Sequence, residues 1–135
     1  MRTLIVEDDF TNRLLLQQLL KDYGQSHIAV NGQEAVEAMQ LALEANDPYN
    51  LICLDIMMPK MNGQDTLKEI RRIEAKKGIA RAECAKVIML TALSDKTNVL
   101  EAIQHQCDCY LIKPCSKEKL LQELRNLKLN RPLGI

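Results

Sequence analysis

The stretch Leu51-Ile52-Cys53-Leu54-Asp55, followed by Ile56-Met57-Met58-Pro59, decides the fold of this chain. Four consecutive apolar residues lead into an aspartate, and a proline soon afterwards stops the strand. A short apolar run of this kind predicts a strand buried on both faces, as in a parallel sheet covered by helices. Asp55 then lies at the carboxyl end of the strand, where open parallel sheets bind ligands. We interpret Asp55 as a site residue, with a turn or cap aspartate as the alternative.

The composition is that of one globular domain. The chain has 135 residues, which is enough for one domain with a core and too few for two. Apolar residues make up 47% and charged residues 27%, which excludes a disordered chain. Lys+Arg and Asp+Glu both number 18, so the charge balance gives no support to direct DNA binding or to an anionic-membrane surface.

The amino terminus reaches Glu7 without the apolar segment of a signal peptide. No apolar run approaches the ~20 residues that a membrane span needs. We therefore expect a cytoplasmic protein with no membrane contact. Its cysteines are expected to be reduced core or incidental thiols, because their number is odd and their spacing does not suit zinc. They are Cys53, Cys84, Cys107, Cys109 and Cys115.

Short apolar segments alternate with segments whose apolar residues recur at helical spacing. The predicted strands are 3–6, 27–30, 51–55, 87–91 and 110–112. The predicted helices run from a Thr11 cap to an exit at Gly24, over 33–45, over 66–77, from a Ser94 or Asp95 cap, and from a Ser116 cap to about Leu127. The connection over 78–86 is long enough for an extra helical turn. This alternation predicts an α/β fold, a doubly wound (βα)5 sheet of five parallel strands with helices on both faces.

For two helices, the sequence predicts which side chains face the core and which face solvent. In the fourth helix, Val99, Leu100 and Ile103 are predicted to form the inward face. In the third helix, the basic residues, including Arg71 and Arg72, are predicted to form a solvated face. We expect one domain over 1–129 and a loose tail over 130–135.

The residues that end the strands bring polar chemistry to one edge of the predicted sheet. The first strand is followed by Glu7 and Asp8, the third ends with Asp55, the fourth with Thr91, and the fifth is followed by Lys113. Converging carboxylates repel one another unless a cation neutralises them. Oxygen ligands without His or Cys favour Mg²⁺ over zinc. An aspartate beside Mg²⁺ can attack phosphorus and form an aspartyl phosphate.

The sequence resembles the receiver domain of two-component response regulators. The matching segments occur in order and cover about residues 2–127. They are Leu4 to Asp9, Leu54 through Gly63, Leu90-Thr91-Ala92, and Tyr110 to Pro114. The resemblance implies a flavodoxin-like fold with strand order 2-1-3-4-5, which places the first and third strands side by side.

The resemblance also implies the phosphoacceptor and its metal. Asp55 is expected to accept a phosphoryl group from a histidine kinase or a histidine phosphotransfer protein. Mg²⁺ is expected to be held by Asp8, Asp55 and the main-chain carbonyl of Met57, with Glu7 contributing through a water. The domain is not expected to be an enzyme in the usual sense, because it catalyses only its own phosphorylation and dephosphorylation.

The remaining implied residues form a switch. Thr91 and Lys113 are expected to contact the phosphoryl group, and Tyr110 is expected to turn inward when Thr91 moves toward it. Lys113-Pro114 is expected to be a cis peptide, which is accessible to X-Pro bonds. The face of the fourth helix, fifth strand and fifth helix then changes shape and is read by an effector protein or by an output domain.

Four positions bear on how far the resemblance extends. Asn62 stands where many members have aspartate, and Cys115 stands where phenylalanine often follows the proline. Cys109 replaces the second acid of a common Asp-Asp-Tyr pattern, while Asp108 keeps the first. Because this set of charges is incomplete, we do not predict the dimer that some members form through that face.

Three other functions were weighed. An aspartate-based phosphohydrolase often has a second acid two residues after the nucleophile, where this chain has Met57. A flavodoxin-like cofactor binder needs hydroxyls or glycines after the first strand, where this chain has acids. A pseudo-receiver that takes no phosphate is opposed by the complete set of acids, threonine and lysine.

Overall fold

The computed structural model describes residues 1–58, 61–91 and 96–129. Five parallel strands form one sheet in the order β2-β1-β3-β4-β5. The strands are β1 (Arg2–Val6), β2 (Gln25–Ala29), β3 (Leu51–Asp55), β4 (Lys86–Thr91) and β5 (Cys109–Ile112). This confirms the predicted flavodoxin-like topology, with the weak second strand at one edge.

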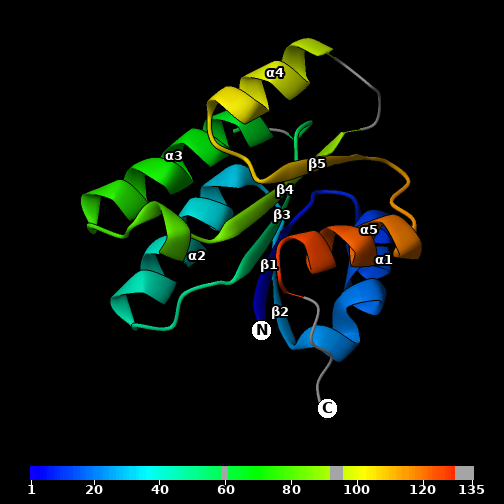
Figure 1. Ribbon diagram of the computed structural model, residues 1–135, viewed down its shortest axis with the longest axis horizontal. Helices are drawn as coiled ribbons and strands as arrows, with labels where there is room; N and C mark the ends of the chain where they lie inside the picture. The colour runs from blue at the N-terminus through cyan, green and yellow to red at the C-terminus, as the bar shows by residue number, and fades with distance from the viewer. Residues whose placement is uncertain (59–60, 92–95, 130–135) are drawn as a thin grey trace.

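Helices cover both faces of the sheet (Figure 1). One face is covered by α1 (Phe10–Leu20) and α5 (Lys117–Asn126), and the other by α2 (Gly32–Glu44), α3 (Gly63–Lys76) and α4 (Lys96–Gln104). Short 3-10 turns, η1 (Lys21–Tyr23) and η2 (Arg81–Glu83), follow α1 and precede β4. The turn η2 is the extra turn expected in the long connection before the fourth strand.

The central strand β3 belongs to both cores of the domain. All five of its residues are buried. Ile52 and Leu54 pack in the core under α2, α3 and α4, while Leu51 and Cys53 pack in the core under α1 and α5. A strand with helices on both faces has no polar side to offer to water, which is why its sequence is apolar without alternation.

The described cysteines are free thiols, as predicted. Burial raises the pKa of Cys53 to about 12. Burial and the nearby Glu123 carboxylate also raise the pKa of the Cys109 thiol above its ordinary value. Because the thiolate is the reactive form of cysteine, these raised pKa values disfavour reaction of the two thiols at neutral pH.

Side chains cap the helices, with one correction to the sequence analysis. Asp9, not Thr11, caps α1, and its Oδ2 accepts a hydrogen bond from the Asn12 amide at 2.9 Å. A carboxylate there satisfies a free amide and also complements the positive end of the helix dipole. Ser116 caps α5 as predicted. The predicted cap at Ser94 or Asp95, the strand stop at Pro59 and the tail over 130–135 lie outside the described residues.

The prediction for the inward face of α4 was wrong for Leu100 and Ile103, whereas Val99 is half-buried. Leu100 and Ile103 are 67% and 55% exposed, whereas Ala102 is fully buried. The small Ala102 side chain faces the core, so the larger apolar residues of this short helix face outward. Ile103 also lines a hollow of about 440 Å³ together with Tyr110 of β5. We call Leu100, Ile103, Tyr110 and Ile112 the α4–β5 face; all four are exposed.

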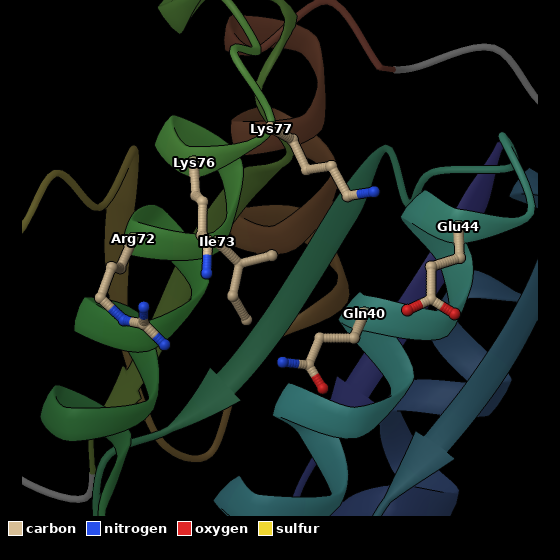
Figure 2. Close-up of a pocket in the computed structure, with 6 residues that line it drawn as sticks. All are labelled: Gln40, Glu44, Arg72, Ile73, Lys76 and Lys77. Carbon is tan, nitrogen blue, oxygen red and sulfur yellow. The ribbon is translucent and has the colours of Figure 1, made fainter.

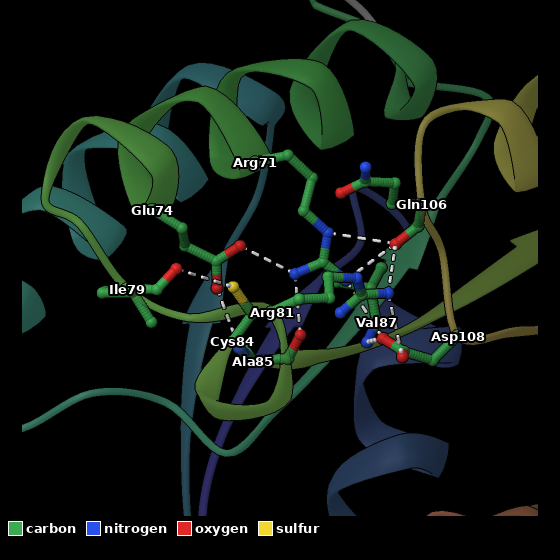
Figure 3. A network of polar contacts seen from close by, with 9 residues as sticks. All are labelled: Arg71, Glu74, Ile79, Arg81, Cys84, Ala85, Val87, Gln106 and Asp108. Carbon is green, nitrogen blue, oxygen red and sulfur yellow. Dashed lines mark hydrogen bonds and ion pairs between the residues drawn. The ribbon is translucent and has the colours of Figure 1, made fainter.

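Arg71 is also placed differently from the prediction, because its side chain is buried in a polar network (Figure 3). Its guanidinium contacts Glu74 Oε1 at 2.7 Å and Asp108 Oδ2 at 3.0 Å, and it donates to the carbonyls of Ala85 and Gln106. The network joins α3 to the segment that leads into β5. Asp108 therefore faces inward and does not contribute to a charged dimer surface.

We expect Arg71→Met to lower the free energy of unfolding by about 3–5 kcal/mol, because it removes the cation beside the buried Glu74 carboxylate and leaves Asp108 with only the longer contact to the exposed Arg81. Arg72→Met is the matched control. Arg72 is exposed and pairs with the partly exposed Glu69, so its loss is expected to change stability far less than the loss of Arg71. Urea unfolding followed by circular dichroism measures both variants. Equal losses in the two variants would contradict a structural role for the Arg71 network.

Candidate functional site

Glu7, Asp8 and Asp55 meet at the carboxyl edge of the sheet, as predicted. Strands β1 and β3 are neighbours, and Val6 pairs with Leu54, so the residues that come next on each strand lie side by side. One carboxylate oxygen from each of the three acids lies within 4.8 Å of the other two. Glu7 and Asp55 are buried, whereas Asp8 is exposed to solvent.

Lys113 supplies the cation that faces these acids. Its Nζ lies 2.6 Å from Glu7 Oε1 and 3.0 Å from Asp55 Oδ1. The Lys113 amide donates to the Thr91 carbonyl at 2.7 Å, which joins the ends of β4 and β5 at the same edge. The peptide between Lys113 and Pro114 is cis, as predicted. One ammonium thus bridges two buried carboxylates that otherwise repel each other.

The carboxylate pair shifts the pKa of Glu7. Burial and the neighbouring Asp55 carboxyl raise this pKa to about 7, and Lys113 opposes the rise. Burial lowers the pKa of Lys113, but its contacts with Glu7 and Asp55 outweigh burial and raise it overall. Glu7 Oε2 is buried and has no hydrogen-bond partner among the described residues. A buried acceptor of this kind needs a proton or a cation beside it.

These residues fit Mg²⁺. The cluster is made of carboxylates, and Glu7 contributes an oxygen without a partner among the described residues. Mg²⁺ binds through one or two carboxylates and keeps several waters, for which the exposed Asp8 side of the cluster leaves room. The Met57 amide donates to Asp55 Oδ1 at 3.4 Å, and its side chain is exposed. The role of its carbonyl as a metal ligand stays a prediction.

The two switch residues occupy the expected strands. Thr91 is buried at the end of β4, one residue beyond Leu90, which pairs with Asp55. Tyr110 lies on β5 and is 43% exposed, so its ring faces solvent in this structure. Their roles as phosphoryl ligand and aromatic switch stay predictions.

Two residues that contact the main chain of the site were not identified from the sequence. A side chain at Gly63 would overlap the Asp55 carbonyl oxygen and lie 2.7 Å from the Ile56 Cα atom, so glycine is required there. The Asn-Gly pair ahead of a helical pattern was a usable signal for this close approach. Arg13 donates to the carbonyls of Glu7 and Asp8. No sequence pattern predicts this contact between an arginine side chain and backbone carbonyls.

Larger hollows than the cavity beside the site lie elsewhere. A hollow of about 480 Å³ between α2 and α3 is lined by Gln40, Glu44, Arg72, Ile73, Lys76 and Lys77 (Figure 2). These residues come from the second halves of helices that begin at the acidic edge, so the hollow lies toward the other end of the sheet. The cavity beside Glu7 and Lys113 has only about 10 Å³, roughly room for one water. The acidic edge therefore offers no enclosed cavity for a small-molecule ligand among the described residues, and of its three acids only Asp8 is exposed.

Comparison with known proteins decides the family. The sequence model of the response regulator receiver domain matches residues 3–125. The chain belongs to this family. The match, together with Met57 at the position where a phosphohydrolase often has its second acid, favours the receiver fold and family over the phosphohydrolase and the flavodoxin-like cofactor binder.

The receiver domain is similar to parts of longer proteins. It is 34% identical over 122 residues to the sensor histidine kinase GacS of Pseudomonas protegens, covering 90% of this chain and 12% of that protein. It is 37% identical over 125 residues to the transcriptional regulatory protein SrrA of Staphylococcus aureus, covering 92% of this chain and 46% of that protein. The chain thus spans less than half the length of these relatives.

A solved structure agrees with the fold. A chain in the crystal structure of the CheX–CheY–BeF3–Mg²⁺ complex from Borrelia burgdorferi superposes with a TM-score of 0.79 at 26% identity, covering 95% of this chain and 89% of that chain. The receiver domain is accordingly a module of two-component phosphorelay signalling. Within the described ranges, no helix combines the length and apolar composition needed to cross a membrane.

The raised pKa of Glu7 predicts a pH-dependent stability of the metal-free domain. At pH values between 4.5, the ordinary pKa of a glutamate, and about 7, Glu7 holds a proton in the folded state but not in the unfolded state. Stability in EDTA is therefore expected to fall, on the order of 2 kcal/mol, as pH rises from about 5 to about 8. Added Mg²⁺ is expected to oppose this fall, because it binds the carboxylate.

Urea unfolding at both pH values measures this effect. Glu7→Gln should remove the fall, whereas Glu37→Gln, at an exposed position on α2, should keep it. The same pH dependence in the wild type and in Glu7→Gln would assign it to other groups.

Proposed function

We propose that Asp55 is the phosphoacceptor of this receiver domain and that its phosphorylation requires Mg²⁺. The proposal is supported by one observation above all: the buried Asp55 carboxylate lies within shared reach of Glu7 and Asp8, and its Oδ1 is 3.0 Å from Lys113 Nζ. This arrangement supplies a nucleophile, oxygen ligands for a metal and a fixed cation. Phosphoryl transfer needs little more than such positioning and charge stabilisation.

The reaction is a displacement at phosphorus. An Asp55 carboxylate oxygen forms a bond to phosphorus as the phosphorus–nitrogen bond of a phosphohistidine breaks, and the imidazole leaves with that electron pair. Lys113 stabilises the phosphoryl oxygens as a point charge, and the Thr91 hydroxyl donates a hydrogen bond to one of them. When bound at Glu7, Asp8, Asp55 and the Met57 carbonyl, Mg²⁺ neutralises the charge on the transferred group. Water later hydrolyses the acyl phosphate.

The phosphoryl donor is a histidine kinase or a histidine phosphotransfer protein. An apolar surface on α1 suits its docking: Phe10, Leu14 and Leu15 are 68%, 46% and 39% exposed. Leu15 also lines the small cavity beside Glu7 and Lys113, so this surface adjoins the acidic edge. A donor bound there places its phosphohistidine close to Asp55.

The output passes through the α4–β5 face. When Thr91 moves toward the phosphoryl group, the space behind it admits the Tyr110 ring, which is exposed in the structure described here. Inward rotation of this ring changes an exposed apolar surface that includes Leu100 and Ile103. An effector protein, or an output domain in a longer chain, reads this population shift in the cytoplasm.

Incubation with acetyl phosphate and Mg²⁺, followed by intact-mass measurement, tests the phosphoacceptor. We expect one base-labile phosphoryl adduct that EDTA prevents and that Asp55→Asn abolishes. Asp65→Asn, which changes an exposed acid at the start of α3, should leave the adduct unchanged. An adduct that persists in Asp55→Asn would place the acceptor elsewhere, and its absence in the wild type would refute the function.

The switch predicts a change at Tyr110. With beryllofluoride and Mg²⁺ added to mimic the phosphorylated state, broadening of the Tyr110 ring signals by a soluble paramagnetic reagent should decrease in NMR spectra. The ring of Tyr23, in η1 after α1, serves as the internal control and should be unaffected. A Tyr110 ring that stays equally accessible would remove it from the switch.

A further inference from the structure

The turn between β1 and α1 carries two of the site's acids, and a side chain from α1 reaches back to hold it. Arg13 Nη1 donates to the Asp8 carbonyl at 2.9 Å and to the Glu7 carbonyl at 3.2 Å. The guanidinium carbon lies 5.6 Å from the centroid of the Phe10 ring, which covers one side of the cation. A single nitrogen thus fixes two consecutive peptide groups.

The base of this contact is rigid. Arg13 lies in the first turn of α1, where its amide donates to the Asp9 carbonyl at 3.0 Å, and Asp9 caps the helix. Further along α1, buried leucines anchor the helix in the core. On the opposite side of the turn, the Glu7 amide donates to the Ala29 carbonyl at 3.1 Å. The main chain of the acidic pair is therefore held between β2 and the side chain of Arg13.

We propose that Arg13 is a positioning residue that sets the Mg²⁺ affinity of the acidic edge by holding the main chain of Glu7 and Asp8. This inference rests on the proposed function, because it presupposes that the edge binds Mg²⁺. Asp8 is exposed and carries the same charge as its neighbours, so repulsion favours its rotation toward solvent. Groups that orient metal ligands from behind commonly change metal affinity by 10–100-fold.

The charge of Arg13 and its hold on the main chain have opposite effects on Mg²⁺ affinity, so the proposed role can be tested. As a cation beside a cation site, the guanidinium alone would weaken Mg²⁺ binding, so removing it would tighten binding. As a clamp on the two carbonyls, it strengthens binding, so removing it weakens binding. Arg13→Met removes both effects and keeps most of the side-chain stem. Arg13→Lys keeps the charge and a group that can donate to both carbonyls.

The experiment is an NMR titration of backbone amides with MgCl2. We expect Arg13→Met to bind Mg²⁺ about tenfold more weakly than the wild type. Arg13→Lys should stay within about threefold, since its ammonium restores the donor. Arg72→Met, at an exposed arginine of α3, should leave the affinity unchanged. At saturating MgCl2, Arg13→Met should be phosphorylated by acetyl phosphate at close to the wild-type rate.

Leu20→Val separates positioning from general stability, because Leu20 is buried at the far end of the same helix. This variant should lose stability in EDTA and keep its Mg²⁺ affinity. Unchanged or tighter Mg²⁺ binding in Arg13→Met overturns the proposal, as does an equal loss of affinity in Leu20→Val. A wild-type domain that binds no Mg²⁺ would refute the proposed function, and the role of Arg13 with it. If the wild type binds Mg²⁺ with the same affinity as Arg13→Met, only the role of Arg13 is refuted.

Discussion

Repulsion between the carboxylates of Glu7, Asp8 and Asp55 is the constraint on which the site depends. Parallel strands in the order β2-β1-β3-β4-β5 bring these acids to one edge, where a cation or a proton must offset their repulsion. In the metal-free domain that cation is Lys113, which reaches from the end of β5 to two of the acids. Burial, together with the neighbouring Asp55 carboxyl, raises the pKa of Glu7 against the opposing effect of this ammonium, and Glu7 Oε2 has no hydrogen-bond partner among the described residues.

Much of this arrangement could be predicted from the sequence, because it depends on local patterns of apolar and polar residues. The apolar run from Leu51 to Leu54 specified a strand with helices on both faces, and the alternation of segments specified a parallel sheet. In such a sheet, residues at strand ends share an edge whatever their separation along the chain. The order of the strands, which places Glu7 next to Asp55, came from the resemblance to receiver domains.

Other features could not be predicted, because they depend on tertiary contacts. The apolar pattern of α4 is compatible with more than one inward face, and burial of Ala102 decided against Leu100 and Ile103. Arg71 and Arg72 are adjacent basic residues, yet one lies in a buried network and the other is exposed. The Arg13 side chain donates hydrogen bonds to backbone carbonyls. Because every residue has a carbonyl, the sequence does not indicate which ones it contacts. These contacts become visible only in three dimensions.

The ion pair between Lys113 and Glu7 joins residues 106 positions apart, close to the two ends of the described chain. On the ribosome, Glu7 and Asp55 are made long before the lysine that neutralises them. A nascent chain that stops short of β5 therefore carries the acids without their counter-charge and cannot assemble the site. The site can therefore form only after synthesis has passed Lys113, which follows the last strand of the sheet, whatever the length of the chain around the domain.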